Sequence, residues 1–273
     1  MTDFPNKASA LIHLSQANLN LLEICPPKFQ QIYLDGLASL PDPEQQESLD
    51  WGSRFHLLMQ QQELGLPIAS LLEKDEQLNN AFASLTQAAP QILTKDSNSW
   101  REAEHCRTLG MGNFLLTVIY DLIIAETDKA TIFDWKTYRQ PPKKSDLAKN
   151  WQTRLYLYVL AETSDYLPEQ ISLTYWFIKS ANPKSHTFQY SAKKHQNTQR
   201  DLRNLLNDLE QRLEAYQQHQ TPFPHRVDCE KKCPFARDLN NLDTQDNPVS
   251  TNLKNCDRDV WRTSIAEIEE VSI

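Results

Sequence analysis

The chain has 273 residues, of which 40% are hydrophobic, and it carries a formal net charge of −8. No apolar run approaches the roughly 18 residues that a membrane-spanning helix needs, which argues against a protein with such a span. The net charge argues mildly against a nucleic-acid partner, because phosphate binding normally rests on clusters of lysine and arginine. Residues 136–154 depart from this balance, with six basic residues and one acidic residue. This segment is either a phosphate-binding surface or a solvated loop.

The first residues show no basic segment followed by an apolar one, so no secretory signal is predicted and the cytoplasm is the expected compartment. The sequence has only five glycines and no Walker-type glycine loop. Any ATP-driven step would therefore have to come from a partner protein such as a helicase.

Helical spacing dominates the first third of the chain. Residues 14–33 have it on both sides of a Cys-Pro-Pro interruption at 25–27, where proline should end one helix and start the next. A further helix is predicted at 49–60, and in it Gly52 and His56 lie one turn apart on the same face. The residues of this helix expected to face a core are Phe55, Leu57 and Leu58. Residues 64–91 also look helical, without evident chemistry.

Strand patterns begin at Trp100. We predict strands at residues 100–109, 115–125, 131–136 and 171–179, with a hairpin partner at 186–190. Helices are predicted from Asp146 to about residue 159 and at 198–218. Cys106 is expected in the core.

These elements predict an α/β (α+β) fold with a central mixed β-sheet flanked by helices. We expect one domain over residues 1–273. Its expected parts are a helical N-terminal part (1–98), a sheet core (99–218) and a cysteine-containing tail (219–273) with a mobile loop at 240–255.

Two acids and a lysine lie inside the predicted strands. Asp121 is in the second strand, and Asp134 and Lys136 close the third. Strands are depleted in Asp, and burying a charge without a partner costs several kcal/mol, so the two carboxylates suggest a shared cation. Asp134 and Lys136 are two residues apart and point to one side, while Trp135 points to the other and leaves its carbonyl group at the strand edge. The alternative is a set of ordinary paired or solvated strand residues.

The order Asp121, Asp134-x-Lys136, Gln152-x-x-x-Tyr156 resembles the PD-(D/E)xK nuclease superfamily, in particular its RecB-type, CRISPR-associated exonuclease-like branch. The resemblance implies a restriction-endonuclease-like core. It also implies that His56 reaches a metal held by Asp121, Asp134 and the Trp135 carbonyl group, although a lone helical histidine is otherwise a core or surface residue.

The same resemblance gives the other motif residues their expected roles. Lys136 would orient the attacking water and offset negative charge. Gln152 would position that water or the phosphate, and Tyr156 would hold the DNA backbone or a base, unless Tyr156 is plain core. Glu104 is a candidate for an outer metal contact, with an exposed strand acid as the favoured alternative.

Five cysteines without a signal peptide favour free thiols or metal ligands over disulfides. Iron–sulfur members of the resembled branch join an N-terminal cysteine to three C-terminal ones. Cys25, Cys229 and Cys233 fit this arrangement only in part, because the spacing is one residue longer and no third cysteine follows in 236–239. Since a [4Fe–4S] cluster normally needs four thiolates, we expect no cluster and interpret these residues as a remnant. A zinc site that adds His225 is chemically allowed.

The function expected from these residues is a Mg²⁺- or Mn²⁺-dependent nuclease that hydrolyses DNA phosphodiester bonds. Single-strand or end processing in repair, recombination or defence follows from family analogy alone. The alternative is a nuclease-like module that binds DNA or a protein without cleaving, which the acidic net charge and the incomplete cysteine set support.

Overall fold

The computed structural model describes residues 11–38, 43–137, 141–179 and 182–226, and the statements below concern these residues. The chain divides into two compact units. Of the described residues, the first unit contains 11–16, 50–137, 141–179 and 182–202, and it holds the predicted motif residues from Gly52 to Tyr156. The second unit contains the described residues 17–38, 43–49 and 203–226. Each unit is described by itself.

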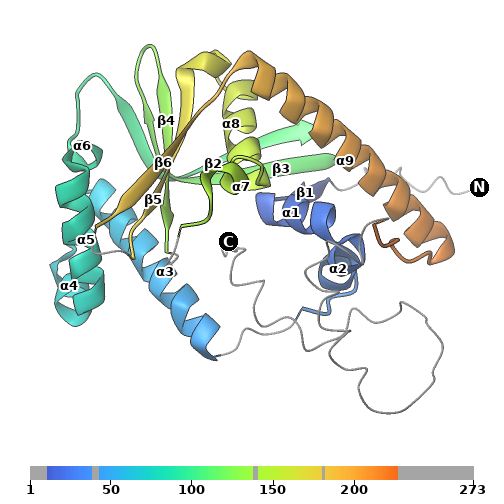
Figure 1. The fold of residues 1–273 in the computed structure, drawn as a ribbon, viewed down its shortest axis with the longest axis horizontal. Helices are drawn as coiled ribbons and strands as arrows, with labels where there is room; N and C mark the ends of the chain where they lie inside the picture. Colours follow the sequence, from blue (N-terminus) through green and yellow to red (C-terminus); the bar gives the residue numbers. More distant parts are fainter. Residues whose placement is uncertain (1–10, 39–42, 138–140, 180–181, 227–273) are drawn as a thin grey trace, which may run out of the picture. The chain divides into compact units, whose positions relative to one another are not determined.

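A six-stranded mixed sheet forms the centre of the first unit (Figure 1). Its strands are β1 (Ile12–Leu14), β2 (Trp100–Met111), β3 (Phe114–Ala125), β4 (Ala130–Lys136), β5 (Ile171–Phe177) and β6 (Lys184–Gln189). The order is β1-β3-β4-β5-β6, and β2 pairs with β3. The β2–β3, β3–β4 and β5–β6 pairs are antiparallel, whereas β1–β3 and β4–β5 are parallel. The predicted mixed sheet is confirmed.

Two connections have clear local causes. The β2–β3 hairpin turns at Gly112, whose φ of +58° lies in the left-handed region that glycine adopts without a steric penalty. The parallel β4–β5 pair requires a crossover, which is made by α7 (Lys144–Leu147), α8 (Trp151–Glu162) and the short η2 (Pro168–Gln170). Helix α8 begins where the side chain of Asn150 accepts a hydrogen bond of 2.8 Å from the backbone N–H of Gln152.

Helices α3 (Pro43–Glu63), α4 (Ala69–Lys74), α5 (Glu76–Ala88) and α6 (Pro90–Leu93) form the helical N-terminal part (Figure 1). From Trp51 onward, α3 packs with α5 and α6 against the face of the sheet that carries Trp135. The buried residues of this cluster include Trp51, Phe55, Leu58, Leu78, Leu85, Ile92, Leu122, Trp135 and Trp176. Because neighbouring strand residues point to opposite faces, Asp134 and Lys136 face α8 instead, on the other side.

Two core predictions are wrong. Leu57 is 43% exposed, because Phe55 and Leu58 share the buried face of α3 and Leu57 lies about 200° around the helix from Phe55. Cys106 is exposed, because it belongs to the face of β2 that also presents Glu102 and Thr108 to solvent. The alternation expected of a strand is present there, but this face is not covered.

The second unit holds most of α1 (Gln16–Ile24), α2 (Pro26–Phe29), η1 (Gln30–Leu34) and the end of α9 (Ala192–His219). As predicted, α1 ends and α2 starts at the Cys-Pro-Pro sequence, with Cys25 buried. Phe223 stacks on Phe29 with ring centres 6.2 Å apart, and its N–H donates to Gln30 Oε1. Cys229, Cys233, Cys256 and the predicted loop at 240–255 lie outside the described residues.

None of the helices in the described ranges is long and apolar enough to cross a membrane.

Candidate active site

Asp121 lies where strand β3 loses pairing on both sides. The β3–β4 ladder ends at Leu122 and Phe133, one position before Asp121 would face Asp134. On the other side the β2–β3 register places Glu104 opposite Asp121, yet these two residues are not paired, and Glu104 has a φ of +52°. A left-handed conformation at a non-glycine residue is uncommon and is often associated with a functional site. The strands therefore separate at the carboxylate.

Three side chains from three elements converge at this separation. His56 on α3 has its Nδ1 atom 3.3 Å from Asp121 Oδ1 and 3.9 Å from Glu104 Oε1. One ligand atom from each residue lies within 4.8 Å of the other two. The Nε2 atom of His56 is 3.1 Å from the carbonyl oxygen of Trp135. Asp121 is buried, whereas His56 and Glu104 are partly exposed, so the cluster is open on one side.

Gly52 lets α3 come close to the end of β4. A Cβ atom at this position would lie 3.3 Å from Thr137 Oγ1, which is tighter than most such contacts. His56 is one turn further along the same helix face, and the close approach brings its ring to the strand. The predicted Gly52–His56 pair thus has a packing reason that spacing alone did not give.

Asp134 and Lys136 form the second half of the site. Lys136 Nζ is 2.8 Å from Asp134 Oδ1, and both side chains are almost fully buried. Gln152 on α8 donates from Nε2 to Asp134 Oδ2 at 2.8 Å. The Lys136 ammonium also lies 5.1 Å from the centre of the Tyr175 ring, a cation–π contact. The structure thus brings together the Asp-x-Lys strand and the first turn of the Gln-x-x-x-Tyr helix.

Tyr156 is fully buried beneath this network. Its ring packs edge to face on Tyr120 at 5.2 Å, and its hydroxyl group lies 3.4 Å from Gln152 Nε2. Burial, with the nearby charges of Asp134 and Asp121, raises the pKa of Tyr156 well above its ordinary value. A neutral buried phenol is poorly placed to hold a DNA backbone or base, and its position suits the orientation of Gln152 instead.

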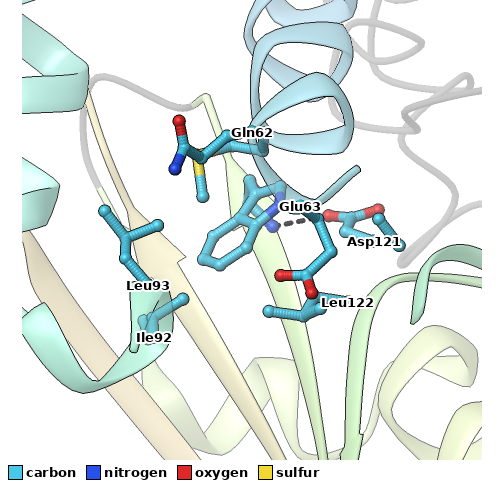
Figure 2. A pocket seen from close by; sticks show the side chains of 9 residues that line it. Gln62, Glu63, Ile92, Leu93, Asp121 and Leu122 are labelled. Atoms are coloured by element: carbon cyan, nitrogen blue, oxygen red, sulfur yellow. Dashed lines mark hydrogen bonds between the residues drawn. The ribbon is translucent and has the colours of Figure 1, made fainter. Parts of the chain in front are cut away.

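The carboxylate of Asp121 also holds the strand beside it. Its Oδ2 atom accepts a hydrogen bond of 2.6 Å from the backbone N–H of Trp135. Figure 2 shows Asp121 and Leu122 at the edge of a small pocket that is bordered by Gln62 and Glu63 of α3. Ile92 and Leu93 of α6 also line the pocket, so apolar side chains there lie beside the polar groups of Gln62, Glu63 and Asp121.

Glu104 takes part in the site more directly than its sequence context indicates. It is partly buried and faces His56, contrary to the favoured expectation of an exposed strand acid. Burial and then the negative charge of Asp121 raise the pKa of Glu104 to about 7, while His56 opposes this rise. Burial and the neighbouring negative charge both disfavour the charged carboxylate, and a bound cation would favour it. Only the strand register, which the sequence does not state, identifies Glu104 as the partner of Asp121.

The donor set fits a hard divalent cation. Carboxylate and carbonyl oxygens with one imidazole suit Mg²⁺ or Mn²⁺, whereas no thiol lies among the residues that form this cluster. The predicted residues His56, Asp121, Asp134 and the Trp135 carbonyl group all border the strand separation. Their roles as metal ligands remain predictions.

The mixed sheet places the upstream acid, Asp121, beside the Asp-x-Lys strand β4, as the nuclease motif predicted. Residues 13–237 match the family profile of the PD-(D/E)XK nuclease superfamily, and the chain belongs to this superfamily. The resemblance seen in the motif and the predicted fold class are confirmed at this level.

The crystal structure of a candidate exonuclease from Eubacterium rectale has a similar fold, with a TM-score of 0.50 and 11% sequence identity over 92% of this chain and 97% of that one. The structure of the protein SSO0001 aligns with a TM-score of 0.33 and 12% identity over 85% of this chain and 86% of that one, which does not establish a shared fold. No curated protein sequence matches the chain significantly.

Proposed function

We propose that this protein is a metal-dependent deoxyribonuclease of the RecB type that hydrolyses DNA phosphodiester bonds with Mg²⁺ or Mn²⁺. The observation that carries the proposal is that a single strand, β4, contributes to both halves of the site. Trp135 of β4 contacts the His56–Glu104–Asp121 cluster, and its neighbours Asp134 and Lys136 form the buried ion pair that Gln152 joins.

Each group has a defined task in this proposal. Asp121 and His56 hold the cation, next to Asp134 and the carbonyl group of Trp135. When bound, a divalent cation supplies Lewis acidity toward the phosphoryl oxygens. The Lys136 ammonium stabilises the negative charge that develops on the phosphate, because it is fixed in a buried, low-dielectric position. Gln152, oriented by Asp134 and Tyr156, positions the attacking water.

The test is a degradation assay on single-stranded and duplex DNA. We expect cleavage by the wild-type protein with Mn²⁺ or Mg²⁺, loss of cleavage in EDTA, and at least a hundredfold loss in Asp121→Ala. Wild-type rates of cleavage in EDTA, or by Asp121→Ala in the presence of Mn²⁺, would contradict the proposal. Labelling one DNA end distinguishes exonuclease from endonuclease products, and the likeness to the Eubacterium rectale protein makes end processing the first activity to examine.

A nuclease-like module that binds without cleaving is the second candidate, and the net charge of −8 favours it. The retained Lys136–Asp134–Gln152 network opposes it, since DNA binding alone does not need a buried ammonium. Binding without turnover in the same assay would favour the second candidate. By family analogy, we propose that the protein acts in DNA repair, recombination or defence, with a helicase as partner.

The exposed lysines between β4 and α8 are expected to contact the DNA backbone. Lys143 and Lys144 are exposed, and the segment that bears them connects the two elements of the Lys136 network. We predict that Lys143→Ala/Lys144→Ala weakens DNA binding. The slope of log K against log salt concentration should become less negative by about 1.5–2, because each phosphate contact releases counterions. Fluorescence anisotropy in Ca²⁺ at several salt concentrations measures this.

The matched control for this pair replaces Lys74 and Lys129, two exposed lysines on α4 and on the β3–β4 turn. The control should bind DNA within about twofold of wild type. An equal loss in both double variants would indicate a net-charge effect and would contradict a local contact surface.

A further inference from the structure

Tyr175 lies outside the nuclease motif, yet its ring contacts the lysine of that motif. The parallel β4–β5 register places Tyr175 beside Asp134. Paired residues of neighbouring strands point to the same face of a sheet, so the Tyr175 side chain shares the α8 face with Asp134 and Lys136. The centre of its ring is 5.1 Å from Lys136 Nζ. Both side chains are almost fully buried, so little water separates the ring from the ammonium.

The hydroxyl group of Tyr175 anchors the ring to α8. Thr153 Oγ1 is 2.6 Å from the carbonyl oxygen of Leu147 and 2.8 Å from the Tyr175 hydroxyl oxygen. A carbonyl oxygen can only accept a hydrogen bond, so the single hydroxyl proton of Thr153 is donated to Leu147. The Tyr175 hydroxyl group therefore donates to Thr153. Because Thr153 follows Gln152 in the first turn of α8, this bond ties the ring to the helix that bears the glutamine of the site.

Phe188 holds the same ring from the neighbouring strand. It lies on β6, where it pairs with Leu173, two residues before Tyr175 on the same face of β5. The rings of Phe188 and Tyr175 are packed edge to face, with centres 5.7 Å apart and an interplanar angle of 71°. Phe188 is also buried. The Tyr175 ring is thus fixed by a hydrogen bond to α8 and by aromatic packing against β6.

A fixed aromatic ring gives the Lys136 ammonium a second point of attachment. Asp134 Oδ1 holds the ammonium at 2.8 Å, but a lysine side chain has four flexible carbon–carbon bonds, and a single ion pair leaves it several arrangements. The face of an aromatic ring carries partial negative charge, which attracts an ammonium most strongly where water is excluded. The ring face offers no strong hydrogen-bond acceptor, so it does not compete with a phosphate oxygen for the ammonium protons.

We infer, on the basis of the proposed function, that Tyr175 is a positioning residue of the nuclease: its ring holds the Lys136 ammonium toward the scissile phosphate. Thr153 and Phe188 hold the ring in turn. Tyr175 is fully buried, so it does not contact the DNA and acts on cleavage only through Lys136. A tyrosine that only fills the core would instead affect stability, and would slow cleavage equally whether or not the ammonium is present.

The first test is a double-mutant cycle in single-turnover cleavage with saturating Mn²⁺. We expect Tyr175→Leu to lower the cleavage rate about tenfold to thirtyfold, the scale of a cation–π contact at a buried site. In the Lys136→Met background the same change should alter the rate less than about twofold, because the ammonium is already absent. Binding of DNA in Ca²⁺ and binding of Mn²⁺ should stay within about twofold of wild type. The matched control is Tyr190→Leu, which removes another buried tyrosine ring and should leave the rate within about twofold.

The second test keeps the size of the ring and changes its charge distribution. Tyr175→Phe preserves the ring face and should cleave within about threefold of wild type. Pentafluorophenylalanine at position 175 should cleave about as slowly as Tyr175→Leu, because fluorine withdraws electron density from the ring face. Both aromatic variants fill the space of Tyr175, so their comparison decides the question if Tyr175→Leu does not fold. Circular dichroism establishes which variants are native.

Several outcomes overturn the role of Tyr175 and leave the proposed function intact. These are a wild-type cleavage rate in folded Tyr175→Leu, an equal loss in both Lys136 backgrounds, and an equal loss in Tyr190→Leu. Equal rates for phenylalanine and pentafluorophenylalanine at position 175 overturn it as well, and so does a loss of Mn²⁺ affinity large enough to account for the slower cleavage. A wild-type protein that does not cleave DNA contradicts the proposed function and the role of Tyr175 together.

Discussion

Replacement of Lys136 by methionine is expected to slow DNA cleavage by about two to three orders of magnitude, the usual cost of removing one preorganised group that stabilises transition-state charge. The ammonium is 1% exposed and lies 2.8 Å from Asp134 Oδ1, so its position is fixed before the substrate binds. Methionine has a similar length and no charge. Initial rates with saturating Mn²⁺ measure the effect, and Mn²⁺ binding should be retained, because Lys136 does not belong to the His56–Glu104–Asp121 cluster.

The variant also leaves the buried Asp134 carboxylate without the ammonium beside it. Breaking a buried pair in this way typically lowers the free energy of unfolding by about 3–5 kcal/mol. Rates are therefore compared at a temperature where circular dichroism shows native structure, and Lys136→Met/Asp134→Asn removes the residual charge. The matched control is Lys129→Met at the other end of β4, where the lysine is 56% exposed and pairs with Glu126. Cleavage by folded Lys136→Met within about twofold of wild type would contradict the proposed role.

Strand β4 explains why the site has two halves. Successive residues of a strand face opposite sides, so Asp134 and Lys136 meet α8, while Trp135 enters the core between α3 and the sheet. The Trp135 peptide group connects both halves, since its N–H donates to Asp121 and its carbonyl group accepts from His56. A shift of this one peptide would move the carboxylate and the imidazole together.

Local sequence patterns predicted the elements, because a period of two or of about 3.6 depends only on neighbouring residues. The strands at 115–125 and 131–136 and the helix that bears His56 lie where these patterns placed them. The Asp-x-Lys spacing also predicted that Asp134 and Lys136 share a side, as their 2.8 Å contact shows.

Long-range partners could not be predicted in this way. Glu104 meets Asp121 through strand register, and Gly52 meets Thr137 through helix-to-strand packing. Neither relation leaves a periodic trace in a single sequence. Tyr156 shows the opposite difficulty, because its helical spacing fits both an exposed and a buried face, and only the packing against Tyr120 decides between them.

Arg101→Ala is expected to destabilise the fold without removing a group of the candidate active site. The guanidinium group, whose side chain is 5% exposed, binds both carboxylate oxygens of Glu63, at 2.7 and 3.2 Å. It also donates to the carbonyl oxygens of Ile92 and Thr94. It therefore ties β2 to the end of α3 and to α6. Among the described residues, truncation leaves the partly buried Glu63 carboxylate with only the 3.6 Å contact of Lys95, and removes a donor from two carbonyl groups. We expect the free energy of unfolding to fall by about 3 kcal/mol.

Urea denaturation in EDTA measures this change without a contribution from bound metal. The control is Arg54→Ala. Arg54 of α3 pairs with Asp75 at 3.2 Å but is 54% exposed, so its loss should cost less than about 1 kcal/mol. Arg101→Ala should also weaken Mn²⁺ binding, since Glu104 follows three residues later on β2 and His56 precedes Glu63 on α3 by two turns. A cost no greater than that of Arg54→Ala would show that the guanidinium contacts do not hold these elements together.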